Sequence, residues 1–304
     1  MSGINTNRTN ITLPNEVASF IIQNTQEASA VMQLAQNIPL PGPGITVPMI
    51  TSDPEADWVA ETDKKPVSNP GLSTKNMTPY KLAVIVPFSN EFARDYNTLY
   101  NALVARIPGA LAKKFDATVF NGTTPGTGFD VLTGCTEQTI SGGSNNFYTA
   151  LVAAEVAIAA QNGDVSGYAM SAQARGEMLG ALDQDKRPIF INNVAEGAIP
   201  RLLGHPVYYS KGLYAAGNAT SGTSGSSGYT PYHNDVLGFA GDWTKAWYGT
   251  VEGVKIDISD QATLTISDTA VNLWERNMFA VRAEIEVGFV ADTNVFNKIV
   301  RAHT

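Results

Sequence analysis

The strongest constraint on the fold is a two-residue alternation that runs unbroken from residue 279 to residue 289. Apolar side chains hold every odd position, and Arg282, Glu284 and Glu286 hold three of the even ones. A period of two is that of a β-strand, and these eleven residues extend roughly 35 Å. We therefore expect one strand to span the whole subunit.

An N-terminal arm is predicted for residues 1–44. Apolar side chains from Val17 to Ala35 recur at three- and four-residue steps, the pattern of an amphipathic helix of about five turns. Residues 38–44 then hold three prolines and two glycines, a density that sustains neither helix nor sheet. We interpret that run as a linker, and the arm as a part that reaches a neighbouring molecule.

An extended β-hairpin is predicted for residues 45–86. Ile45, Val47 and Met49 alternate in its first limb, and residues 77–86 form a second strand-like limb. Connections of about forty residues that carry their own strands more often have a function than serve only to link two elements.

The tip of this hairpin is acidic and rich in proline, and it places the apolar pair Trp58 and Val59 at its centre. A solvated loop is the alternative reading of the same residues. The local charge is −3, from five carboxylates against two lysines: Asp53, Glu55, Asp57, Glu61, Asp63, Lys64 and Lys65.

A long, half-buried helix is predicted from a cap at Ser89 to about Val119, because apolar side chains recur at nearly unbroken four-residue steps. Pro108-Gly109 interrupts the pattern and predicts a kink or a local break. A glycine loop at residues 121–128 ends the helix. It follows a helix and lacks Gly-Lys-Ser/Thr, so it does not read as a phosphate loop.

From Asn145 the pattern changes to α/β, and the last hundred residues are mostly strands. The low-complexity stretch from Gly217 to Gly228 is expected to be a flexible surface loop. The other predicted elements are a helix ending near Gly163, a strand at 168–170, a helix capped by Ser171 and running to about Leu182, and strands at 189–191 and 206–209.

Residues that carry chemistry are scarce, so we predict no catalytic, cofactor or metal site. His205, His233 and His303 are far apart, and none has a serine-elbow partner. Cys135, the single cysteine, has no basic residue beside it in sequence and is expected to be a buried or inert thiol. Trp243 and Trp247 are expected to be packing anchors.

The charge content favours a subunit that contacts copies of itself. Charged residues make up only 16% of the chain, and a surface with few charges often becomes interface. The net charge of −8 provides no basic footprint for sequence-specific nucleic-acid binding. No apolar run approaches the roughly 18 residues of a membrane span, and the N-terminus does not read as a secretion signal. We therefore expect a soluble protein made in a cytoplasm.

The order of these parts resembles a tailed-phage major capsid protein of the Hong Kong ninety-seven type. The resemblance implies an α+β fold with an N-terminal arm, an extended β-hairpin loop, a peripheral domain with a long spine helix, and an axial α/β domain. The resembling segments stand in family order at residues 56–61, 87–95, 121–134, 169–171 with 182–185, 203–207, 238–243 and 279–284.

The resemblance also implies a division of the chain. The extended loop at 45–86 lies over a neighbouring subunit, and 87–129 hold the spine helix and glycine loop of the peripheral domain. The axial domain at 130–270 lies near the capsomer centres, and 271–304 return to the peripheral domain as the long strand. The family's N-terminal scaffolding region is absent here, and the initial Met favours a separate scaffold over a processed chain.

The implied function is a major capsid protein. It assembles into hexamers and pentamers of an icosahedral head shell that encloses a double-stranded DNA genome. The implied partners are copies of itself, a separate scaffolding protein, a portal and a decoration protein; the implied location is the virion, after assembly in the bacterial cytoplasm. An encapsulin-like shell around a cargo enzyme is the alternative. The implied assembly interface comprises Trp58, Val59, Glu61, Lys64, Lys65, Arg282 and Glu286.

Some family members join their subunits by an isopeptide bond between Lys and Asn, with a Glu as proton acceptor. The motif positions here are Lys65, Asn277 and Glu284. Arg282 departs from the pattern, because it lies on the same strand face as Glu284 and is placed to pair with it. We therefore favour a solvated or interface strand face over a cross-linking site.

Overall fold

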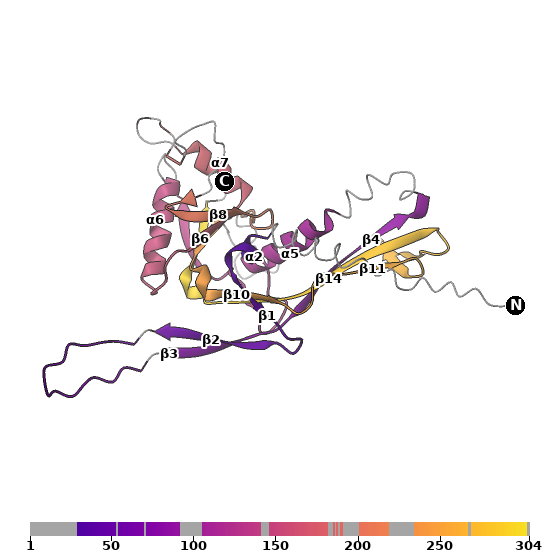
Figure 1. Cartoon of the computed structure of the whole chain (residues 1–304). Coiled ribbons are helices and arrows are strands. Elements are labelled where there is room, and N and C mark those ends of the chain that lie inside the picture. Colours follow the sequence, from indigo (N-terminus) through magenta and orange to yellow (C-terminus); the bar gives the residue numbers. More distant parts are fainter. Residues whose placement is uncertain are drawn as a thin grey trace, which may run out of the picture.

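The computed structural model describes residues 29–52, 54–69, 71–91, 105–140, 146–181, 185, 187, 189–190, 201–218, 234–266 and 269–302. A body of helices and sheets carries a two-stranded arm on one side and a ribbon of strands on the other (Figure 1). The predicted α+β class is confirmed. The elements that matter below are α2 (Ala30–Leu34), β1 (Gln36–Pro39), β2 (Ile45–Ser52), β3 (Gly71–Met77), β4 (Tyr80–Ser89), α5 (Ile107–Asn121), β10 (Ala246–Thr250), β11 (Lys255–Ser259) and β14 (Met278–Ala291).

The long strand predicted from the alternation is β14, at 14 residues. It pairs antiparallel with β4 and β11 in its first part and with β10 in its last. Val281, Ala283 and Ile285 are buried on one face, while Arg282 is exposed on the other. The helix α5 covers the buried face through Ile107 and Leu111.

A second sheet forms the α/β lobe, in the strand order β5-β15-β9-β6-β8-β7. Helices α6 (Asn146–Ala159) and α7 (Ala172–Gly180) accompany it, and Ser171 caps α7 as predicted. The remaining strands are β5 (Thr136–Ile140), β6 (Gly167–Met170), β7 (Arg201–Leu202), β8 (His205–Tyr209), β9 (Asp235–Gly241) and β15 (Phe296–Arg301); β12 (Thr263–Ile266) and β13 (Thr269–Asn272) form a separate hairpin, and η1 (Trp243–Lys245) and η2 (Thr293–Val295) are short 3-10 turns.

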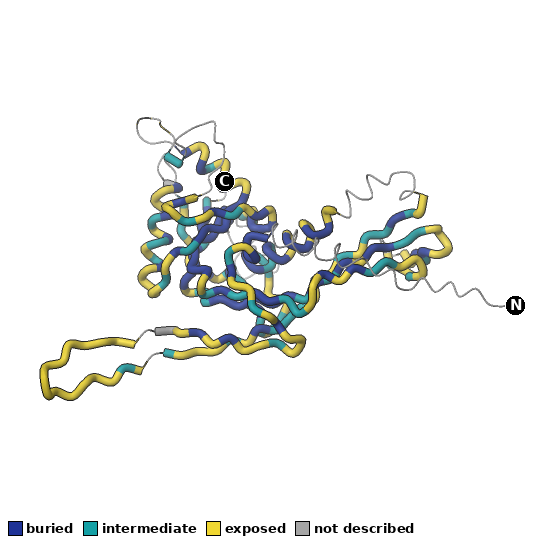
Figure 2. The backbone as a smooth tube through the Cα atoms, viewed as in Figure 1, coloured by how far each residue is buried: buried dark blue, intermediate teal, exposed yellow. Residues whose placement is uncertain are grey.

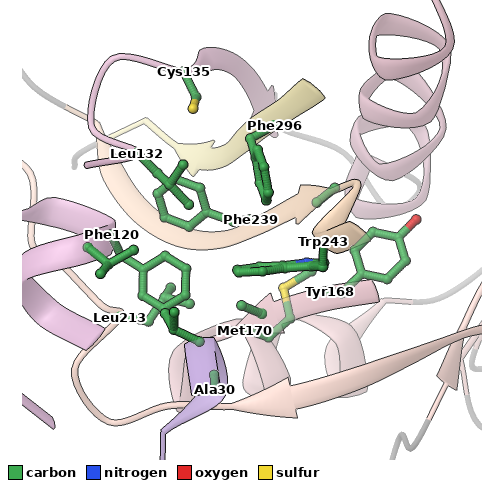
Figure 3. Close-up of a cluster of buried hydrophobic side chains, with 14 of the residues drawn as sticks. Ala30, Phe120, Leu132, Cys135, Tyr168, Met170, Leu213, Phe239, Trp243 and Phe296 are labelled. Atoms are coloured by element: carbon green, nitrogen blue, oxygen red, sulfur yellow. The ribbon is translucent and has the colours of Figure 1, made fainter. Parts of the chain in front are cut away.

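The main core packs around Trp243 (Figure 3). Its ring lies edge-on to Phe296 at 5.0 Å and to Phe120 at 6.2 Å, and its indole N–H donates to the Gly167 carbonyl at 3.0 Å. Trp243 is therefore the packing anchor that the sequence predicted. Trp247 is half-buried and donates to Gln36 Oε1 at 3.1 Å.

The predicted strand at 189–191 is wrong for its described part, because Ile189 and Phe190 lie in a bend. The Ile189 N–H donates to the Ala181 carbonyl just after α7, at 3.1 Å. The Phe190 ring packs edge-on against Phe147 at 5.8 Å. These apolar side chains cover the lobe from a loop, so a short apolar run was not enough to identify a strand.

The linker predicted after the first helix is wrong in its first residues. Ile38 and Pro39 belong to β1, which pairs in parallel with β10. A proline is tolerated there because β1 is the edge strand of its sheet. The preceding helix α2 ends at Leu34, as expected, and buries Ala30, Val31 and Met32 in the main core. The rest of that predicted helix, 17–28, lies outside the described residues.

The predicted hairpin is confirmed in its first limb and corrected in its second. Strand β2 pairs with β3, from Ile45 opposite Met77 to Ser52 opposite Gly71. The predicted second limb, 77–86, instead contributes to β4, which pairs with β14 over ten residues. The chain leaves one partner for the other at Thr78-Pro79, where proline supplies no backbone donor.

The predicted break in the long helix is confirmed, because α5 begins at Ile107 with Pro108 in its first turn. A proline suits that position, where its missing N–H would have no helical partner. The helix ends at Asn121, before the glycine loop, as predicted. Residues 92–104 of the predicted helix, residues 219–228 of the predicted surface loop, His233 and His303 lie outside the described part of the chain.

Candidate assembly interface

The arm, formed by β2, β3 and the connection between them, is exposed along most of its length (Figure 2), and several of its exposed residues are apolar. Ile50 and Leu72 stand opposite each other in the hairpin and are 63% and 75% exposed. At the tip Trp58 is 104% exposed and Val67 is 83% exposed. A lone two-stranded ribbon with this much apolar surface is marginal in water, so a surface that covered the arm would stabilise it.

A partly buried contact holds the root of the arm to the body. The Lys75 ammonium on β3 donates to Asp130 Oδ2 and to the Ala291 carbonyl at the end of β14, both at 2.7 Å. Asp130 Oδ2 also accepts the Ala291 N–H at 3.0 Å. The ammonium and carboxylate are each about one-third exposed or less, at 34% and 27%. A partly desolvated ion pair with further hydrogen bonds fixes the direction of the arm relative to the body better than an exposed ion pair does.

A pair of glycines lets the arm root seat on the central sheet. Gly249 on β10 and Gly288 on β14 face each other across the strands. A Cβ added to Gly288 would lie 2.7 Å from the Met77 side chain and 2.9 Å from Leu40. Met77, at the end of β3, is fully buried there. The two glycines leave a flat surface on the sheet, and the root of the arm packs there. We call this surface the socket of the arm.

The even-numbered face of β14, with its neighbours on β4 and β11, forms a charged ladder. Lys81 pairs with Glu286 at 3.0 Å, and Arg282 pairs with Asp257 at 2.5 Å. The predicted Arg282–Glu284 pair also forms, with a longer Nε to Oε2 distance of 3.8 Å. Hydrogen bonding to Glu286 raises the pKa of Lys81, and hydrogen bonding to Asp257 raises the pKa of Arg282. Both cations therefore stay charged at neutral pH.

Within one chain the three residues at the cross-linking motif positions do not meet. Lys65 lies on the exposed tip of the arm, which Figure 1 places on the opposite side of the body from the β4–β14–β11 ribbon. Asn277 precedes β14 in a left-handed turn, with φ at 53°, and accepts from Asn90 at 2.8 Å. Glu284 lies seven residues further on, which is about 23 Å along a strand. Within one subunit these three residues are therefore too far apart to form the cross-link.

Of the other predicted residues, Trp58, Val59, Glu61 and Lys64 lie on the exposed arm. Cys135 is buried, as predicted, and burial raises its pKa to about 12. His205 starts β8, half-buried, with its ring centre 6.4 Å from that of Tyr168. In the described ranges, no three His, Cys, Asp or Glu residues gather as a metal site would need. Nor does any described helix combine the length and apolarity of a membrane span.

One buried polar cluster was not predicted from the sequence. Asp116 on α5 is fully buried and accepts from Ser29 Oγ at 2.6 Å, Ser210 Oγ at 2.5 Å and the backbone N–H groups of Ala30 and Val31 at 2.9 and 3.4 Å. Burial raises the pKa of Asp116, and these donors oppose the rise. It stood in the sequence as one acid in an apolar helix pattern, a signal that points to a buried carboxylate.

Comparison with known proteins gives one consistent result. The family model described as "Phage capsid family" matches residues 9–299. The chain is similar to a probable major capsid protein, gp17, of Mycobacterium phage L5, with 28% identity over 301 residues, 93% of this chain and 87% of that protein. It is also similar to the major capsid protein of Staphylococcus phage 80alpha, with 26% identity over 300 residues, 96% of this chain and 85% of that one.

Solved structures agree in fold. A structure from Mycobacterium phage Adephagia superposes with a TM-score of 0.70 at 19% identity, covering 91% of each chain.

Proposed function

The chain belongs to the phage capsid family, and from that premise we propose that it is the major capsid protein of a tailed phage. Copies of the chain assemble into hexamers and pentamers, and these close into an icosahedral shell around double-stranded DNA. The mature protein is then a component of the virion. The similarity over nearly the whole length to phage major capsid proteins supports this proposal.

The observation that carries the proposal is the arm. Its root is fixed by Lys75 and Met77, whereas its apolar side chains Ile50, Leu72 and Trp58 are exposed. A folded chain gains nothing from a rigidly rooted apolar ribbon in water. We propose that each arm lies over a neighbouring subunit and that the charged ladder of β14 belongs to the same interface.

The further partners are part of the proposal as well. A separate scaffolding protein, a portal and a decoration protein would complete the head, and assembly would take place in the bacterial cytoplasm. The phage relatives favour a virion over an encapsulin-like compartment.

Replacing the arm tip tests this function. Because Ser52 and Gly71 face each other, an Asn-Gly turn in place of residues 53–70 closes the hairpin without changing its register. We expect a folded subunit that no longer assembles, measured by sedimentation, with the circular dichroism spectrum retained. Exchange of residues 219–228 for a Gly/Ser linker of the same length is the control and should keep assembly. Shells at wild-type yield from the tip variant would refute the role of the arm.

We propose that the shell is held without covalent cross-links. Glu284 shares Arg282 with Asp257, so a cation accompanies the carboxylate that would have to take the proton. Assembled particles boiled in detergent should run as one band at 32.4 kDa. A ladder of multiples that disappears in Lys65→Arg would show that the bond forms.

A further inference from the structure

The outer face of α5 carries the most concentrated unpaired positive charge in the described part of the chain. Arg106, Lys113 and Lys114 are exposed along one side of the helix, at steps of seven and eight residues, which return to one helix face. Lys211 is exposed beside them. The backbone of its neighbour Gly212 touches α5, since a Cβ there would lie 2.3 Å from the Lys113 carbonyl oxygen.

These cations have no anion of their own within the described residues. The only acid of α5 is Asp116, which is buried and committed to Ser29 and Ser210. None of the four basic side chains forms an ion pair with a described residue. Every cation of the charged ladder that is named above, by contrast, has a carboxylate within 4 Å.

Helix stability does not explain the placement. The first turn of α5 contains no acidic residue, and Arg106 sits at the N-terminal cap without a side-chain hydrogen bond. A cation at that end opposes the helix dipole and is unfavourable there. The arrangement therefore adds positive potential to a face where the helix alone would favour an anion.

The two faces of the central sheet differ accordingly. The arm root seats on the even face of β14, at Gly288 and Val290, which is also the face of the charged ladder. The helix α5 covers the odd face, through Ile107 and Leu111, and Phe115 packs against Phe289. The unpaired cations thus lie on the side of the sheet away from the arm. Figure 1 shows the arm and α5 on opposite sides of β14.

We propose that the face of α5 formed by Arg106, Lys113, Lys114 and Lys211 lines the inside of the shell and contacts the phosphate backbone of the enclosed DNA. The inference rests on the proposed function, which supplies a closed shell and a polyanion within it. Charge complementarity identifies the occupant, because phosphates bind unpaired lysine and arginine without regard to sequence. A chain with net charge −8 then holds its genome weakly and through one surface.

The first measurement is DNA binding by unassembled subunits. The variant Lys113→Gln with Lys114→Gln removes two cations from the α5 face. Its control, Lys81→Gln with Lys255→Gln, removes two exposed cations from the ladder face. With a duplex of about 30 base pairs, we expect the α5 variant to lower the slope of log affinity against log salt by about 1.8, at roughly 0.9 for each lost phosphate contact. The control should keep the wild-type slope.

The second measurement is orientation in closed shells. Native Cys135 is buried, so a cysteine introduced at Lys113 is the reactive thiol. A polyethylene-glycol maleimide too large to cross the shell should leave Lys113→Cys unlabelled until the shell is dissociated, whereas a small maleimide that crosses the shell should label it in intact shells.

Each outcome decides. Labelling of Lys113→Cys by the large maleimide in intact shells overturns the inference, as does an unchanged salt slope in the α5 variant. Protection of Lys113→Cys together with an unchanged slope would point to an acidic protein on this face and would equally overturn it. Absence of shells counts against the proposed function alone, because the binding measurement needs only subunits.

Discussion

At the scale of residues, Asp116 connects three distant parts of the chain. It joins Ser29 before α2, α5 itself and Ser210 after β8. The carboxylate accepts from every donor that points at it, two hydroxyl and two backbone groups. A fully satisfied buried carboxylate is tolerated where a half-satisfied one is not.

Asp116→Asn should therefore destabilise the subunit by about 1–3 kcal/mol, because the amide nitrogen leaves one buried backbone N–H without an acceptor. Urea unfolding of the unassembled subunit measures the change in free energy. Asp260→Asn, at an exposed position, is the control and should stay within about 0.5 kcal/mol. If both variants unfold at the wild-type urea concentration, the cluster does not hold the N-terminal segment.

Only some of the buried residues could be recognised from the sequence. Cys135 and Trp243 were recognisable because each type has a strong default, the inert thiol and the buried ring. Asp116 was not, since its partners Ser29 and Ser210 lie 87 and 94 residues away and only the fold brings them together. Arg282 was paired correctly with Glu284 on its own strand, but its closer partner Asp257 lies on another strand.

At the scale of elements, the socket of the arm is its most sensitive part. Gly288→Ala places a methyl group against Met77 and Leu40, so either the arm root or β1 must move. We expect a loss of about 1–3 kcal/mol from this overpacking, together with lower assembly yield.

The control for this substitution is Gly176→Ala in α7. A Cβ there meets nothing within 4 Å, and alanine favours a helix. Equal stability of the two variants, measured by urea unfolding, would show that the socket adapts and that the arm direction is not set there.

The elements that could be read from the sequence are those with one apolar face. Strand β14 alternates because α5 covers one side and charges line the other. Strand β3 was missed because most of its side chains are exposed in the isolated chain, so no alternation marks it. The pattern of the following segment belongs to β4, whose partner β14 lies about two hundred residues later. Local periodicity therefore could not indicate which strand β4 pairs with.

At the scale of the whole molecule, the order of parts was predictable and their attachment was not. The arm, the helix with its break at Pro108, the α/β lobe and the final long strand follow the expected sequence. Residues 29–39 of the predicted N-terminal arm are part of the body through α2 and β1, because Asp116 and β10 hold them there. Within the described residues, the apolar arm is uncovered and the cations on the outer face of α5 are unpaired, and we propose that other molecules cover both.

The most direct test of the central claim is negative-stain electron microscopy of the purified protein, alone and co-expressed with a scaffolding protein. Exposed apolar arms on rigid roots predict closed angular shells, or rings with five- and six-fold symmetry, in at least one of the two samples. Monomers alone in both samples, at high concentration, would contradict the claim that this chain is a shell subunit.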